Sequence, residues 1–332
     1  MYQFIHSLVD YLSRFHIAQS FFKGKGLILM LHRVAPFEDK LTPNENMKVT
    51  PTFLEQFIVD SLQSGYVFIS LDELHYGLLH QSLPEYFICI TLDDGYKDNL
   101  TYAYPIFAKY NIPFCIYICT SFPQSTHSMW WFGLEDYLLS TDYMEFQHIG
   151  YDLSSKESKE MMFLTLRHHI ITHTQSYEDG EEIMRSLNIP YNPRAYDSLA
   201  LTWEDIKLLD TMGGGDKNLC TIGAHTHSHP IFNQLSQKQV IDDITLSQQL
   251  FTQYLGYIPK HFAYPFGSRL EVDSSYFSII PKLGFATATT TRRGCIYPQH
   301  KNHLYALPRI FFGEHFMIQS AFRIRKKRIV TT

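Results

Sequence analysis

Two adjacent carboxylates and a pair of histidines are the residues of this sequence best suited to chemistry. Asp93 and Asp94 directly follow an apolar run, and the segment HTHSH places His225 and His229 four residues apart. This spacing lets both imidazoles face one point if the chain turns helically there. Two imidazoles and one carboxylate make a three-ligand site with open positions for water, as in catalytic sites of Zn²⁺ and its first-row neighbours. We therefore predict a divalent metal, with a simple polar turn as the alternative.

The two aspartates are expected to perform different tasks. Adjacent residues of a strand point to opposite sides, so Asp93 and Asp94 are poorly placed to serve one purpose. One carboxylate can bind the metal while the other acts as a general base on nearby water. An ordinary Asp-Gly turn is the alternative. That turn explains Asp94 and Gly95 but leaves Asp93 without a reason.

Short apolar runs alternate with amphipathic helices along much of the chain, which predicts a parallel α/β sheet or barrel. Helices are expected over 50–66, where Thr50 is a plausible N-cap, and over about 236–255. The carboxyl ends of parallel strands share one crevice, so the polar residues that follow them should converge. The predicted strands are 27–32, 87–94, 113–119, 220–225, 261–267 and 285–291.

The alternation is lost between residue 125 and about residue 201. We predict a mostly helical insertion there, within one barrel domain that spans residues 27–322. Residues 1–26 have apolar positions at helical spacing and predict an amphipathic helix that packs on the body or, as the alternative, rests on a membrane. The tail 323–332 contains RIRKKR and is expected to be a solvated terminus, with an anionic partner such as lipid headgroups as the alternative.

Composition limits the class of protein. Of the 332 residues, 45% are hydrophobic and 18% are charged, which is typical of a folded globular chain. The net charge of −5 gives no footprint for nucleic acid. Five cysteines without a CxxC pair indicate neither a disulfide framework nor a thiolate zinc site. No signal peptide or apolar span is evident, so a cytoplasmic protein is predicted, with peripheral membrane contact through the two termini as a variant.

The motifs resemble those of the polysaccharide deacetylase family, the NodB-homology group known as carbohydrate esterase family 4. TLDDG at 91–95 resembles the family's TFDDG motif, HTHSH at 225–229 its H[ST]xxH motif, and FAYPFG at 262–267 its third motif. The resemblance implies a distorted (β/α)7 barrel. It also implies a metal-dependent hydrolase that removes an N-acetyl or similar acyl group from an amino sugar, in a surface polysaccharide or a lipid-linked glycan precursor.

The resemblance also implies roles for individual residues. Asp93 falls on the family's general base, and Asp94, His225 and His229 fall on its metal ligands. The metal is Zn²⁺ by this resemblance, with Co²⁺ or Ni²⁺ as alternatives. A backbone N–H near Phe266 is expected to help hold the oxyanion.

Two further residues of the expected site are aromatic. Tyr264, from the third motif, is assigned with Phe266 to oxyanion or substrate contacts. Trp131, in the predicted insertion, is assigned to stacking on a sugar ring, with core packing of its helix as the alternative.

Two departures from the family pattern are informative. The third motif usually carries an arginine where this chain has Ala263, and Arg309 in LPRI is a candidate replacement. The family's last motif, LxLH, is missing from the C-terminal part, but LMLH occurs at 29–32. This resembles the circularly permuted branch that acts on poly-N-acetylglucosamine and related polysaccharides, which assigns His32 as the general acid.

Two other functions remain open from the sequence. The missing arginine and the missing C-terminal LxLH also fit a catalytically inactive carbohydrate-binding protein on the same fold. The motifs fix the reaction centre better than the substrate, so a hydrolase of a non-sugar linear amide is a second alternative.

Overall fold

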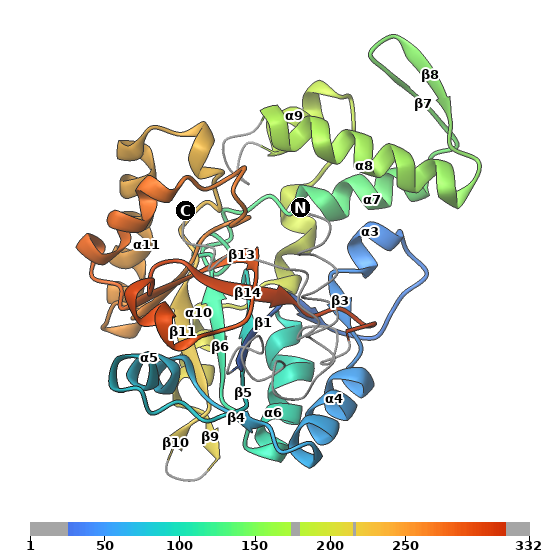
Figure 1. Cartoon of the computed structure of the whole chain (residues 1–332). Helices are drawn as coiled ribbons and strands as arrows, with labels where there is room; N and C mark the ends of the chain where they lie inside the picture. Colours follow the sequence, from blue (N-terminus) through green and yellow to red (C-terminus); the bar gives the residue numbers. More distant parts are fainter. Residues whose placement is uncertain (1–25, 174–179, 215–216, 317–332) are drawn as a thin grey trace, which may run out of the picture.

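The computed structural model describes residues 26–173, 180–214 and 217–316, and its centre is a closed ring of seven parallel strands (Figure 1). β1 pairs with β14 on one side and with β5 on the other, which closes the ring. The predicted distorted (β/α)7 barrel is confirmed. The ring consists, in spatial order, of β1 (Gly26–Leu31), β14 (Leu307–Phe311), β13 (Thr287–Arg293), β12 (His261–Ala263), β11 (Cys220–Ala224), β6 (Phe114–Ile118) and β5 (Phe87–Leu92).

The strands are apolar on both faces because both faces are covered. All six residues of β1 and all six of β5 are buried. Alternate residues belong to different cores: Leu27, Leu29 and Leu31 pack in the large core under the helices, whereas Ile28 packs in a smaller cluster with Tyr117. This alternation follows from the pleat of a strand and separates side chains inside the ring from those outside it.

Helices between the strands cover the outside of the ring. α4 begins after Thr50, whose hydroxyl accepts a hydrogen bond from the amide of Phe53, so the predicted N-cap is confirmed. The longest helix, α11, ends at Gly256, which has the left-handed conformation typical of a C-cap. The covering helices are α4 (Pro51–Gln63), the π-helix η1 (Asn99–Ala103) with α6 (Tyr104–Tyr110), α10 (Trp203–Thr211) and α11 (Gln237–Leu255). α5 (Leu71–His80) instead packs on the smaller cluster that contains Ile28 and Tyr117.

The strands differ from the predicted ranges mainly at their ends. The predicted strand 261–267 stops at Ala263, and the remaining residues of the third motif form a loop. β14 was not predicted from the sequence, because Pro308 interrupts a run of only five residues. Short elements complete the barrel region: β2 (Arg33–Val34), α3 (Thr42–Glu45), β3 (Lys48–Val49), β4 (Val67–Phe68), β9 (Gly213–Gly214), β10 (Lys217–Asn218), η3 (Phe232–Gln234), η4 (Ser274–Ser278), η5 (Ile280–Leu283) and η6 (Pro298–Asn302).

Between β6 and α10 the chain forms a group of helices and one hairpin, of which α7, α8, α9, β7 and β8 lie together at the top of Figure 1. They share a core of their own that includes Trp130, Leu134 and Phe163. The hairpin was missed by the sequence analysis, although YMEF alternates exposed and buried residues as a strand does. The elements are α7 (Trp130–Leu139), β7 (Tyr143–Phe146), β8 (Ile149–Asp152), α8 (Lys156–His173), α9 (Gly180–Ser186) and η2 (Pro193–Leu199).

The limits 125–201 of the insertion and 27–322 of the barrel domain stay predictions. Except for Gly26, which begins β1, the predicted N-terminal helix lies outside the described residues, and so does the basic tail 323–332.

The capping residue of α4, Thr50, also binds the chain segment that follows β14. A substitution of Thr50 can therefore test both contacts. The Thr50 amide and hydroxyl donate hydrogen bonds to Glu314 at 2.9 and 2.8 Å. We expect Thr50→Ala to lower the free energy of unfolding by about 1–2 kcal/mol, because the cap and the hydroxyl contact with Glu314 are lost while the amide contact remains. Urea denaturation measures the change. Thr52→Ala, at an exposed position of the same helix, is the control, and an equal loss in both variants would contradict this role of Thr50.

Candidate active site

The polar residues that follow the strands meet in one pocket of about 460 Å³. His32 follows β1, Asp93 and Asp94 follow β5, and His225 and His229 follow β11. The two aspartates and the last two histidines are each at most 5% exposed. Closure of the ring therefore brings together the five residues that the sequence analysis expected to converge.

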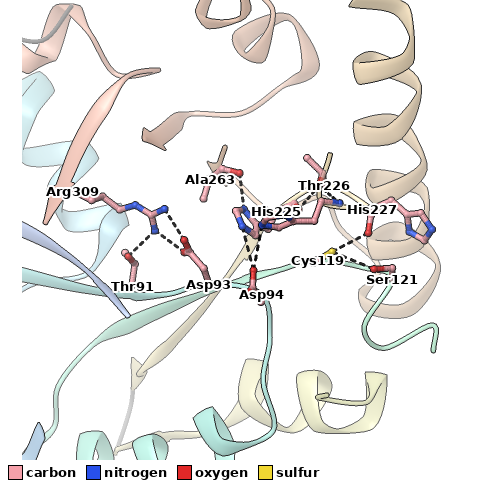
Figure 2. Close-up of polar contacts among 11 residues, drawn as sticks. Thr91, Asp93, Asp94, Cys119, Ser121, His225, Thr226, His227, Ala263 and Arg309 are labelled. Carbon is pink, nitrogen blue, oxygen red and sulfur yellow. Dashed lines mark hydrogen bonds and ion pairs between the residues drawn. The ribbon is translucent and has the colours of Figure 1, made fainter. Parts of the chain in front are cut away.

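Asp94, His225 and His229 form a compact three-ligand cluster. The Nε2 atoms of both histidines lie 3.5 Å from Asp94 Oδ1. His225 Nδ1 is 2.8 Å from the carbonyl oxygen of Ala263, so we assign the ring proton to Nδ1, which leaves a lone pair on Nε2 facing Asp94 (Figure 2). Ligands about 2.0–2.2 Å from one tetrahedral Zn²⁺ lie about 3.4 Å apart. The donor set and its spacing therefore fit a divalent cation.

The electrostatics of Asp94 also favour a cation. Burial, and next the negative charge of Asp93, raise the pKa of Asp94 well above its usual value. Asp94 Oδ1 is buried, and no hydrogen-bond donor reaches it from the part of the chain that the structure describes. A buried carboxylate oxygen without a donor is costly unless a cation compensates it.

Unusual backbone conformations are concentrated around this cluster. Asp94, Thr226, His229 and Phe266 have positive φ angles of 76°, 67°, 53° and 57°. Such conformations are uncommon for residues other than glycine and are found preferentially at functional sites. The expectation that HTHSH turns helically is therefore wrong, because left-handed residues at both 226 and 229 bend the segment without forming a helix. Gly95, with φ of 98°, carries the chain away from β5 as expected.

Asp243 of α11 holds the HTHSH segment in this conformation, and the sequence analysis missed it. Its Oδ1 accepts the amide of His227 at 2.7 Å, and its Oδ2 accepts the amide and hydroxyl of Ser228 at 3.1 and 2.5 Å. The only signal in the sequence was an acidic residue beside Val240 and Ile244, on the buried side of a helix. His227 itself points away, with Nδ1 2.9 Å from the hydroxyl oxygen of Thr120.

Asp93 forms a bidentate ion pair with Arg309 of β14 (Figure 2). The two N–O distances are 2.6 and 2.7 Å, and Arg309 also donates to Thr91 Oγ1 and to the carbonyl oxygen of Thr290, both at 3.1 Å. Burial alone would raise the pKa of Asp93, but the charge and hydrogen bonds of Arg309, together with the charges of His225 and His32, outweigh burial and lower the pKa. The guanidinium thus keeps Asp93 ionised and fixed in orientation.

His32 lines the same pocket as Asp93 and is influenced by its charge. Burial lowers the pKa of His32 to about 4, and the negative charge of Asp93 is the main opposing influence. Its Nδ1 has no hydrogen-bond partner among the described residues. The ring therefore presents a polar edge inside the pocket, with Phe311 at 6.3 Å between ring centroids.

The three aromatic residues assigned to substrate contact do not share one environment. Trp131 and Phe266 both line the pocket, and the Phe266 ring lies 4.8 Å from that of His229. Tyr264 is fully buried, packs against Phe262 in the large core, and donates its hydroxyl to the carbonyl oxygen of Tyr305. The prediction that Tyr264 contacts substrate is wrong. Ala263 faces the inside of the ring, so the next residue along β12 must face the outside.

Comparison with known families identifies part of this architecture. Residues 212–288 match the model of the family described as polysaccharide deacetylase. This range contains the histidine segment and the third motif, and the barrel that carries them has the fold of the family. The matched segment is similar to this family and spans less than half of the chain. The match agrees with the resemblance of the motifs to that family.

Solved structures share the fold. The deacetylase PplD of Streptococcus pyogenes, determined in complex with acetate, superposes with a TM-score of 0.59 at 19% identity over 88% of this chain and 94% of its own. IcaB from Ammonifex degensii gives 0.55 at 17% identity, covering 90% and 94% of the two chains. A de-N-acetylase from Aggregatibacter actinomycetemcomitans gives 0.55 at 13%, covering 89% and 97%.

No curated protein sequence matches the chain significantly. Among the described residues, no helix has the length and apolar character that crossing a membrane requires.

The contacts of Asp243 predict a specific effect on metal binding. Asp243→Ala removes the acceptor of three hydrogen bonds from residues between His225 and His229, so we expect Zn²⁺ affinity to fall about 10- to 100-fold. Isothermal titration of metal-free protein with Zn²⁺ measures it. Asp242→Ala is the control, since its exposed carboxylate pairs with Lys238 on the same helix, α11. Equal affinities in the two variants would rule out this positioning role.

Proposed function

We propose that this chain is a metal-dependent hydrolase that removes an N-acetyl or similar acyl group from an amino sugar, in a surface polysaccharide or a lipid-linked glycan precursor. One observation carries the proposal: a cluster of Asp94, His225 and His229 adjoins an ionised carboxylate, Asp93, in a single pocket. A metal ligand set beside an ionised base is one arrangement that supports hydrolysis of an amide.

Asp94, His225 and His229 would hold the metal, which we expect to be Zn²⁺, with Co²⁺ or Ni²⁺ as alternatives. When bound, the metal supplies Lewis acidity toward the amide carbonyl oxygen and lowers the pKa of water. Asp93 would accept the proton of the attacking water on its carboxylate. Arg309 would keep that carboxylate ionised beforehand and hold it in one orientation.

The leaving amine needs a proton, and His32 is the residue proposed to give it. In the structure burial lowers the pKa of His32 to about 4, so the ring is neutral near pH 7. The imidazole would therefore take a proton from solvent and pass it to the amine. Asp93 would hold the proton that it takes from water and release it to solvent after the product leaves. The negative charge of Asp93 favours the protonated form of His32.

The substrate would be held by aromatic residues and backbone. We propose that the backbone N–H of Phe266 stabilises the oxyanion and that Trp131 stacks on a sugar ring. Both residues line the pocket beside the ligand cluster. The ion pair of Arg309 with Asp93 supports an active enzyme over an inactive binding protein, since Ala263 was a main reason to consider the latter.

Cellular location remains part of this proposal. We keep the prediction of a cytoplasmic protein, and peripheral membrane contact through residues 1–26 and 323–332 as its variant. No nucleic-acid partner is expected from the negative net charge.

Asp93 and Asp94 should differ in what their loss removes. We expect Asp93→Asn to lower the rate of acetate release from N-acetylglucosamine oligomers or lipid-linked glycans by about 10²- to 10⁴-fold while bound metal is retained. Asp94→Asn should lose both metal and activity. Metal content by mass spectrometry and acetate release measure the two effects. Normal turnover by Asp93→Asn would exclude it as the base, and activity that survives chelator treatment would exclude the metal.

His32 should affect turnover more than binding. We expect His32→Gln to lower kcat by about 100-fold or more with little change in bound metal, because the amine then leaves without a proton donor. His75→Gln is the matched control, since His75 is also half-buried with a lowered pKa but lies on α5, away from the pocket. A near-normal kcat for His32→Gln would show that His32 is not the proton donor and has only a structural role.

A further inference from the structure

The outer part of the pocket differs in chemistry from its buried end. Leu164, Arg167 and Ile171 of α8 line it, and their spacing of three and four residues places them on one face of the helix. Large apolar side chains at this rim are exposed to solvent: Leu164 to 53% and Phe311 to 42%. Exposed apolar side chains that gather at a pocket mouth indicate an apolar part of a ligand.

Positive charge at the rim is not balanced. The carboxylates that line the pocket are Asp93 and Asp94, and both are buried at its inner end. Arg33 also lines the pocket, but its Nε lies 2.7 Å from a carboxylate oxygen of Asp98. Arg167 is exposed, and within the described ranges no carboxylate pairs with it. An anionic ligand group would therefore be attracted to the rim.

A neutral glycan would find few partners on these outer walls. Asn44 and Thr291 are neutral polar residues of the lining, and both are engaged: Asn44 donates to the carbonyl oxygen of Trp131, and Thr291 to that of Phe266. The remaining outer wall is mostly apolar. It consists of Pro43, Met47, Trp130, Trp131, Phe132, Phe163, Leu164, Ile171 and Phe311.

We infer that the substrate is an acylated amino sugar whose phosphate is esterified to a long aliphatic chain, and not a neutral glycan polymer. Arg167 binds the phosphate, and the aliphatic chain lies along Leu164, Ile171 and Phe311. This inference rests on the proposed function for the position of the sugar, which the ligand cluster and Asp93 place at the inner end. An exposed arginine is often only solvated. Here, however, it lies between two apolar side chains on the wall of a pocket.

The inference is tested by measuring how tightly octyl phosphate binds to the metal-loaded protein. Octyl glucoside is the comparison ligand without charge, and inorganic phosphate is the comparison ligand without an alkyl chain. All concentrations stay below those at which micelles form. We expect octyl phosphate to bind about tenfold tighter than either. Arg167→Gln should weaken the binding of octyl phosphate about tenfold and leave the binding of octyl glucoside unchanged, because one charge-assisted contact is lost. Leu164→Ser should weaken the binding of both octyl ligands. Lys282→Gln, at an exposed lysine of η5 outside the pocket lining, is the control.

The outcomes separate this inference from the proposed function. Equal binding of octyl phosphate to Arg167→Gln and Lys282→Gln overturns the inference, and so does phosphate binding that needs no alkyl chain. Deacylation of neutral oligomers could then still be observed, and the proposed function would stand. Conversely, Arg167-dependent binding of octyl phosphate, without turnover of any N-acylated sugar phosphate or oligomer, would support the inference and reject the proposed function.

Discussion

The site depends on how two adjacent buried carboxylates are kept from repelling each other. The two carboxylates have different surroundings: the guanidinium of Arg309 compensates Asp93 at 2.6 and 2.7 Å, whereas Asp94 Oδ1 faces two imidazole Nε2 atoms at 3.5 Å and no hydrogen-bond donor among the described residues. The first arrangement holds a negative charge in place, and the second leaves room for a cation. The left-handed φ of Asp94 turns its carboxylate toward the histidines and away from Asp93. The end of β5 therefore places the two carboxylates in different environments.

Closure of the barrel explains why the compensating groups can come from distant parts of the chain. A closed ring has no first strand, so β1 lies between β14 and β5 although it begins the described structure. Arg309 in β14 therefore pairs with Asp93, and His32 at the end of β1 lines the same pocket. These residues are far apart in the sequence, because the order of strands along the chain differs from their order around the ring.

The sequence predicted the position of a site residue wherever that position followed from the residue type and from the end of a strand. The ligand cluster, Asp93 and His32 follow apolar runs, and parallel strands end together. The prediction for Tyr264 was wrong because β12 ends at Ala263. Without the register of this short strand, the sequence does not show which of its side chains face the inside of the ring. Arg309 remained only a candidate, since pairing across 216 residues depends on ring closure. Asp243 was missed because the sequence alone does not distinguish it from other acidic residues on helices. Its role depends on the loop that faces it, which only the structure shows.

Chemistry and selectivity come from different parts of this molecule. The ring supplies the ligand cluster, the base and its arginine, all buried and rigidly paired. The segment between β6 and β11 supplies Trp131, Leu164 and Arg167, which line the outer pocket from helices with a core of their own. Changes in those helices can alter the shape and charge of the entrance without disturbing the hydrogen bonds of the ring. A search for the ligand of this protein should therefore begin with α7 and α8, whereas the strand ends carry the residues proposed for the reaction.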